Sequence, residues 1–208
     1  MNNLFIFDLD GVLINTTDIH FECLNKALSK IDSKYIISYE EHILKYNGLS
    51  TKKKLEILTK EKNLSVNNYD LINNIKQEET FKKFNYIKKN DYLIEIFEKI
   101  KYKNIKIAVA SNCIKESVKI ALSKLNLINY IDIYLSNEDV INSKPFPEIY
   151  WKCMIFLNSI PKKTVIFEDS DIGILGATET CSNIIKVDSY KLLTYENIQL
   201  GFNFLMDK

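Results

Sequence analysis

Two aspartates stand two residues apart in the segment Asp8-Leu9-Asp10-Gly11, directly after the apolar run Leu4–Phe7. Side chains alternate along an extended segment, so both carboxylates are expected to point to the same side. Two like charges held together need a cation or a shared proton. A divalent ion such as Mg²⁺ would meet this need through oxygen ligands, and the glycine would let the chain turn close to a ligand. The alternative is a capping aspartate followed by an Asp-Gly turn.

Three further segments carry polar side chains where an apolar run ends or a helix is expected to begin. Ser111-Asn112 follows the run Lys106–Ala110 and predicts either an anion site or a plain helix N-cap. Lys144 lies in Ser-Lys-Pro-Phe-Pro, where two prolines stiffen the chain around one cation, or where a surface lysine precedes a helix. Glu168, Asp169 and Asp171 follow the run Thr164–Phe167. Acids are favoured at any helix start, but three acids at the end of a buried strand indicate a metal site.

The elements that would position these residues follow from the apolar pattern. Short continuous apolar runs are typical of buried parallel strands, and they occur at 4–7, 106–110, 164–167 and 183–187, with a weaker one at 131–135. Helical patterns occur at 92–101, 114–125, 147–158 and 172–180. Alternating strands and helices predict an α/β fold, a doubly wound, Rossmann-like parallel sheet. Ligands bind such sheets at the carboxyl ends of the strands, which is where the polar residues fall.

The interval from about Thr17 to Lys89 breaks this alternation. It holds helical patterns at 18–29, 39–46, 51–62 and 68–88 and no convincing strand. We therefore expect an inserted α-helical cap domain at 17–89, and a discontinuous core domain made of 1–16 and 90–208. The basic run Lys52-Lys53-Lys54 is interpreted as a solvated helix face.

Composition excludes several classes of protein. The 208 residues are 46% hydrophobic and 26% charged, which is typical of a globular chain, and the net charge of +1 indicates neither a nucleic-acid nor a membrane partner. No apolar stretch approaches the ~20 residues that span a bilayer. Four cysteines without a C-x-x-C pair predict neither zinc nor disulfides, and so a reducing, cytoplasmic location. All 28 cations are lysine, so anions cannot be bound by arginine.

Taken in order, four motifs resemble those of the haloacid dehalogenase-like hydrolase superfamily, in its branch with a helical cap. They are D-x-D-G-V-L from Asp8, an apolar strand followed by Ser111-Asn112, S-K-P-x-P around Lys144, and E-D-S-x-x-G from Glu168. The resemblance covers essentially the whole chain. It implies the α/β core with an inserted cap and hydrolysis of a phosphomonoester.

The resemblance also implies a role for each motif residue. Asp8 would attack phosphorus and become an aspartyl phosphate, and Asp10 would protonate the leaving oxygen and then activate water. Ser111, Asn112 and Lys144 would hold the phosphoryl group, and Lys144 would also offset the charge of Asp8. Mg²⁺ would be bound by the Asp8 side chain, the Asp10 carbonyl and Asp169, with Glu168 acting directly or through water.

In the cap, the substrate-facing positions implied by the resemblance to the beta-phosphoglucomutase branch are Thr16, His20, Lys45 and the loop Gly48–Lys52. His20 has the alternative of a cap-interface residue. Thr51 stands where the mutase pattern carries an arginine, with Lys52 beside it. After Ser111, this chain has Asn112-Cys113 where members of the family often have small residues. Cys113 is therefore expected near the mouth of the active site.

The resulting hypothesis is a Mg²⁺-dependent phosphatase of a small phosphorylated metabolite, a monomer or weak homodimer. Two alternatives stay open. One is a sugar phosphomutase of the beta-phosphoglucomutase type, and the other is a non-catalytic protein that binds a phosphorylated ligand.

Overall fold

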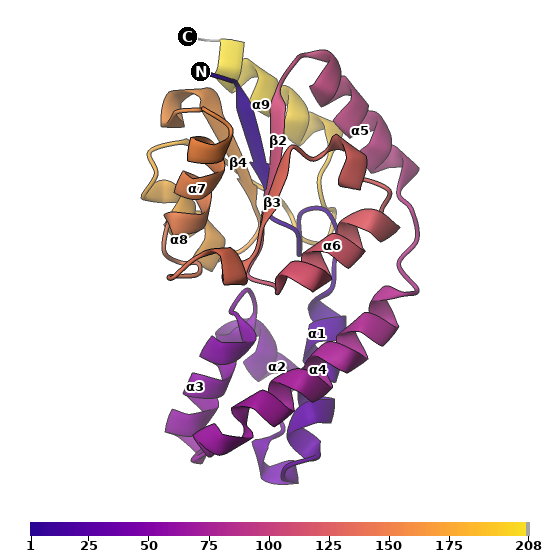
Figure 1. Ribbon diagram of the computed structural model, residues 1–208, viewed down its shortest axis with the longest axis vertical. Coiled ribbons are helices and arrows are strands. Elements are labelled where there is room, and N and C mark those ends of the chain that lie inside the picture. Colours follow the sequence, from indigo (N-terminus) through magenta and orange to yellow (C-terminus); the bar gives the residue numbers. More distant parts are fainter. Residues whose placement is uncertain (207–208) are drawn as a thin grey trace. The chain divides into compact units, whose positions relative to one another are not determined.

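The computed structural model describes residues 1–206. The chain divides into two compact units, Met1–Asn15 with Lys88–Lys208 and Thr16–Ile87 (Figure 1). These boundaries lie one to two residues before those expected from the sequence. We call the first unit the core and the second the cap, and each is described by itself.

A five-stranded parallel sheet forms the centre of the core unit (Figure 1). Its strands are β1 (Leu4–Phe7), β2 (Lys106–Ala110), β3 (Ile133–Leu135), β4 (Thr164–Glu168) and β5 (Asn183–Lys186). They lie in the order β3-β2-β1-β4-β5, so the chain reverses its direction of winding between β1 and β4. This switch point is where α/β sheets place their ligands. The doubly wound parallel fold predicted from the sequence is confirmed.

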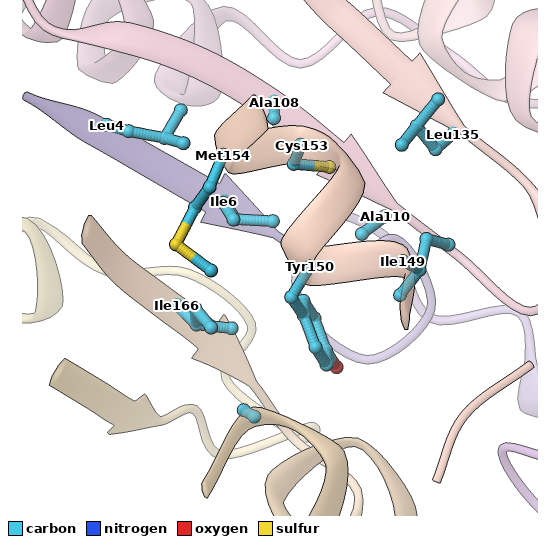
Figure 2. Packing of buried hydrophobic residues seen from close by; sticks show 11 residues of the cluster. Leu4, Ile6, Ala108, Ala110, Leu135, Ile149, Tyr150, Cys153, Met154 and Ile166 are labelled. Atoms are coloured by element: carbon cyan, nitrogen blue, oxygen red, sulfur yellow. The ribbon is translucent and has the colours of Figure 1, made fainter. Parts of the chain in front are cut away.

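Alternate residues of the strands build two separate cores. Leu4 and Ile6 of β1 and the alanines of β2 face α7 (Glu148–Phe156), which contributes Tyr150 to this cluster (Figure 2). Phe5 and Phe7 face the other side, in a cluster of aromatic rings with Phe167 of β4, Phe97 of α5 (Asp91–Tyr102) and Phe202 of α9 (Tyr195–Met206). Because both faces are covered, the strands carry continuous apolar runs.

The core helices occur close to where the sequence predicts them. The remaining ones are α5 (Asp91–Tyr102), α6 (Lys115–Lys124), α8 (Asp171–Thr178) and α9 (Tyr195–Met206), with short 3-10 turns at Ile128–Tyr130, Asn137–Asp139 and Pro161–Lys163. Helix α9 is not expected from the sequence. Gly201 lies inside it, and its lack of a Cβ lets the helix approach Phe5 and Phe167 closely. A glycine inside an apolar segment therefore marks close packing here and does not end the helix.

The cap unit is helical. It holds α1 (Thr17–Ser29), α2 (Tyr39–Glu41), α3 (Thr51–Lys62) and α4 (Tyr69–Phe84), with 3-10 turns at Ser33–Tyr35 and Val66–Asn68. Residues His42–Tyr46 form a π turn directly after α2, within a segment expected to be one helix. The main hydrophobic cluster of the cap joins α1, α3 and the start of α4 through side chains such as Leu24, Leu58 and Ile72. Among the described residues, none of the helices is both long enough and apolar enough to cross a membrane.

Candidate active site

Polar residues from two strands meet at the carboxyl end of the sheet. Asp8 directly follows β1, and its main-chain N–H still donates to Phe167 of β4, at 2.9 Å. Glu168 is the last residue of β4, and Asp169 follows it. Carboxylate oxygens of Asp8, Glu168 and Asp169 all lie within 4.8 Å of one another. The parallel register thus brings together acids that are some 160 positions apart in the sequence.

Lys144 binds this cluster through every hydrogen of its ammonium group. Its Nζ donates to Asp8 Oδ1 at 2.6 Å, to the carbonyl of Ala110 at 2.7 Å, and to Glu168 Oε1. An ammonium has three N–H donors, so these three acceptors use all of them. The side chain of Lys144 is only 3% exposed, which excludes the interpretation of a surface lysine before a helix.

The cluster holds more negative charge than Lys144 can balance. Burial raises the pKa of Asp8 well above its usual value, and Glu168 raises it further, while Lys144 lowers it. Burial, followed by the charge of Glu168, raises the pKa of Asp169 to about 7. Burial opposes the charge on Lys144 as well, but Asp8 and Glu168 hold the pKa of Lys144 well above its usual value. Three carboxylates and one ammonium leave an excess of two negative charges when all are ionised.

The residues present fit a divalent cation. The charge excess matches one such ion, and the donors are carboxylate oxygens, which suit Mg²⁺. Gly11, with φ +88°, leaves room for Asp169, since a Cβ at this position would overlap its carboxylate. Gly173 of α8 does the same for Glu168. Both glycines belong to the sequence motifs, and each is needed because a carboxylate lies against the backbone.

Asp10 is not one of these three acids, but its charge raises the pKa of both Asp8 and Asp169. Its Oδ2 accepts a hydrogen bond from the thiol of Cys113 at 3.1 Å, and its main chain forms a short bridge with Ile14. Cys113 therefore lies beside the acid pair, as expected from the sequence. Asp171 lies outside the cluster, since it is exposed and pairs with Lys186.

The segment after β2 holds Lys144 in place. Asn112 accepts from the main-chain N–H of Lys144 at 3.1 Å and donates to its carbonyl at 3.3 Å. The hydroxyl of Ser111 accepts from the N–H of Cys113 at 3.0 Å, which closes a turn. The N-cap of α6 is Ile114, so the alternative that Ser111 caps this helix is wrong. Contact of Ser111 or Asn112 with phosphate stays a prediction.

The four substrate-facing residues expected in the cap differ in exposure. Thr16 and His20 are buried at the start of α1. Lys45 is exposed and pairs with Glu61 at 3.0 Å, and Lys52 is exposed on α3. The interpretation of the basic run as a solvated face is wrong for its last member, because Lys54 is buried. Binding of substrate by these residues stays a prediction.

Tyr150 of α7 also belongs to the site, although no sequence pattern indicates it. Its side chain is fully buried, and its hydroxyl donates to Glu168 Oε1 at 2.7 Å. Burial raises the pKa of Tyr150 well above its usual value, which keeps the hydroxyl protonated. Its position three residues after Pro147, within an apolar helix, indicates only a core residue. The contact with Glu168 depends on how α7 packs on the sheet.

Comparison with known proteins places this arrangement in a family. The chain is 32% identical to a phosphorylated carbohydrates phosphatase of Thermotoga maritima, over 83% of this chain and 78% of that protein. It is 28% identical to a phosphoglycolate phosphatase of Aquifex aeolicus, over 82% and 78%. A beta-phosphoglucomutase structure from Clostridium difficile superposes with a TM-score of 0.79 at 23% identity, covering 100% of both chains, and so shares the fold. Residues 5–187 match the model of the family described as haloacid dehalogenase-like hydrolase, and the chain belongs to this family.

Proposed function

We propose that the chain is a Mg²⁺-dependent phosphatase that hydrolyses a small phosphomonoester through an aspartyl phosphate on Asp8. The observation that carries the proposal is the buried contact between Asp8 Oδ1 and Lys144 Nζ, at 2.6 Å. An ammonium at this distance lowers the pKa of Asp8 and so favours its ionised form, against the burial and the neighbouring acids that raise the pKa. An ionised carboxylate at the ligand-binding edge of the sheet is a suitable nucleophile.

In the first step, Asp8 attacks the phosphorus atom of the substrate. A bond forms between a carboxylate oxygen and phosphorus, and the bond to the leaving alcohol breaks. Asp10 gives its proton to the departing oxygen, and the Cys113 thiol holds the carboxyl group of Asp10 in place. Since all three donors of Lys144 are in use, binding a phosphoryl oxygen requires Lys144 to exchange one of its present contacts.

In the second step, water attacks the phosphorus of the aspartyl phosphate. Asp10, now ionised, takes a proton from this water, the bond between phosphorus and Asp8 breaks, and phosphate leaves. The metal ion would be held by Asp8, Asp169 and the carbonyl of Asp10, with Glu168 acting directly or through water. When bound, Mg²⁺ supplies charge neutralisation between the carboxylates and the phosphoryl oxygens.

Hydrolysis of an aryl phosphate tests the proposal directly. The purified chain with Mg²⁺ is expected to release phosphate at a rate that Asp8→Asn lowers by about 10⁴-fold or more, as expected when the nucleophile is removed. Phosphate release that is equal in the variant would refute the role of Asp8. Assays with a panel of phosphorylated metabolites would then identify the preferred substrate. Sugar phosphates come first, because the Thermotoga maritima relative is named a phosphorylated carbohydrates phosphatase.

The same panel separates the phosphatase from the phosphomutase. A mutase needs a second phosphate site, and Thr51 stands where the mutase pattern has arginine. We expect free phosphate as the product. Interconversion of sugar monophosphates that depends on a bisphosphate, with little phosphate released, would instead favour the mutase. Membership in a hydrolase family and the complete acid pair argue against a non-catalytic binding protein.

A further inference from the structure

The buried carboxylate of Glu168 receives two donors on one oxygen. Glu168 Oε1 accepts from Lys144 Nζ and also from the Tyr150 hydroxyl, at 2.7 Å. The carbonyl of Gly173 on α8 lies 3.1 Å from the same hydroxyl, whose single proton is directed to Glu168 at the shorter distance. The other oxygen, Oε2, has a longer contact of 3.4 Å with Ser170. The Tyr150 hydroxyl therefore makes a short hydrogen bond that holds Glu168 from the side of the hydrophobic cluster under α7.

Tyr150 also contacts the ammonium that Glu168 shares with Asp8. Lys144 Nζ lies 5.2 Å from the centre of the Tyr150 ring, which is within the range of a cation–π contact. The ring extends from α7 among the buried side chains of β1, β2 and β4, with its hydroxyl at the far end (Figure 2). A ring packed in this way offers a rigid surface, so the ammonium and the carboxylate are both held against one side chain.

The position of Lys144 depends on a balance between two carboxylates. Its ammonium binds Asp8 on one side and Glu168 on the other. A second donor on Glu168 reduces the need of this carboxylate for Lys144, because part of its charge is satisfied by the hydroxyl. Without the hydroxyl, a fully buried carboxylate depends on Lys144 alone for a close donor and draws it away from Asp8.

We propose that Tyr150 is a positioning residue of the active site, whose hydroxyl holds Glu168 so that Lys144 stays on the nucleophile Asp8. This inference rests on the proposed function and adds to it a residue from the hydrophobic core. Loss of a group that orients the residues around a metal site typically lowers activity by about 10–100-fold. Because Asp8 acts in the chemical step, the loss is expected in kcat.

Tyr150→Phe removes the hydroxyl and keeps the ring, so it is the variant that tests the proposal. With an aryl phosphate and saturating Mg²⁺, we expect kcat to fall about 10–100-fold, with KM changed less than about threefold. Tyr46→Phe is the matched control, since Tyr46 is another fully buried tyrosine, and its hydroxyl has no hydrogen-bond partner within residues 1–206. Ile149→Val controls for a general loss of packing on α7. Both controls are expected to keep kcat within about twofold of the native chain.

A double-mutant cycle tests whether Tyr150 acts through Glu168. In a Glu168→Gln background, Tyr150→Phe is expected to change kcat less than about threefold, because the coupled partner is already altered. A 10–100-fold loss that persists in this background would overturn the inference. So would a kcat of Tyr150→Phe within twofold of the native value, or an equal loss in Ile149→Val.

Two further measurements keep the test decisive. If the native chain hydrolyses no phosphate ester, the proposed function fails, and the crystal structure of Tyr150→Phe tests the positioning role separately. Lys144 Nζ is expected to move beyond hydrogen-bond distance of Asp8 Oδ1, and an unchanged contact would overturn the inference. If Tyr150→Phe does not fold, p-aminophenylalanine at position 150 fills the same space with a weaker donor. A lower kcat is then expected, and the full native kcat would overturn the inference.

Discussion

Replacing Lys144 with methionine would leave two buried carboxylates without their shared cation. Methionine is unbranched like lysine and only one atom shorter, so the main loss is the ammonium and its contacts with Asp8 and Glu168. Removing one partner of a buried ion pair costs about 3–5 kcal/mol. Since this ammonium serves two carboxylates and a main-chain carbonyl, we expect Lys144→Met to lose about 5 kcal/mol of unfolding free energy at pH 8.

The loss of unfolding free energy in Lys144→Met should become smaller as the pH falls. Lys144 is the neighbour that lowers the pKa of Asp8, so its removal raises that pKa further above the unfolded value of 3.8. Between the pKa of Asp8 in the native chain, itself well above 3.8, and the still higher pKa in the variant, the folded variant binds a proton that neither the unfolded chain nor the folded native chain binds. Stability then increases as protons are added, by at most about 1.4 kcal/mol for each pH unit.

Urea denaturation between pH 6 and pH 8 measures both effects. Fluorescence of Trp151, the single tryptophan of the chain, follows the core unit because this residue lies on α7. Lys186→Met is the control, since this exposed lysine of the core unit forms a surface pair with Asp171 and is expected to change stability little at any pH. A deficit below about 1 kcal/mol for Lys144→Met, or one that grows as the pH falls, would refute the assigned charge balance.

Four further predictions concern the acid pair, the metal, the cap cations and a cap histidine. Asp8→Asn should abolish turnover with the fold intact, whereas Asp10→Asn should disable the second step and let phosphoenzyme accumulate; near-native turnover in either variant, measured by phosphate release, contradicts the assignment. Chelation should remove activity, Mg²⁺ should restore it and Ca²⁺ should inhibit it, because Ca²⁺ adopts looser coordination; full activity in excess chelator would rule out the metal site. Lys45→Ala or Lys52→Ala should raise KM for the preferred metabolite and leave an aryl phosphate unaffected; equal effects on both substrates would exclude a role in selection, and Glu61→Gln controls for loss of the Lys45 pair. His42 is fully buried, and burial lowers its pKa from 6.5 to about 4. Between these two pH values the unfolded chain binds a proton that the folded chain does not, so the free energy of unfolding decreases as the pH falls. From pH 7 to pH 5, the native chain should lose about 2 kcal/mol more unfolding free energy than His42→Gln, as measured by urea denaturation. An equal loss in both chains would contradict the lowered pKa of His42.

The sheet and its charged edge could be predicted because their sequence patterns are local. A strand buried on both faces needs a continuous apolar run, and the polar residue after each run must lie at the carboxyl end of a parallel sheet. Asp8, Ser111 and Glu168 were located in this way. The contact of Lys144 with Asp8 was expected only from the family resemblance, because no local pattern brings residues 136 positions apart together.

Features that depend on tertiary packing could not be predicted. Lys54 belongs to a basic run on a helix, and only the packing of the cap shows that it is buried. The π turn at His42–Tyr46 changes the helical phase by one residue, which no apolar period indicates. No helix is expected at α9 from the sequence, and the close contact of its Gly201 with two phenylalanines of the sheet follows only from packing.

The composition of the chain bears on why a tyrosine belongs in the active site. With no arginine available, the anionic cluster depends on lysine, and a lysine supplies three donors where an arginine supplies five. Lys144 uses its three on Asp8, Glu168 and the carbonyl of Ala110. A further close donor to Glu168 must come from another group, and the Tyr150 hydroxyl provides it without adding charge. A second cation here would cancel part of the negative excess that a divalent metal requires, whereas a neutral donor orders the cluster and leaves that excess intact.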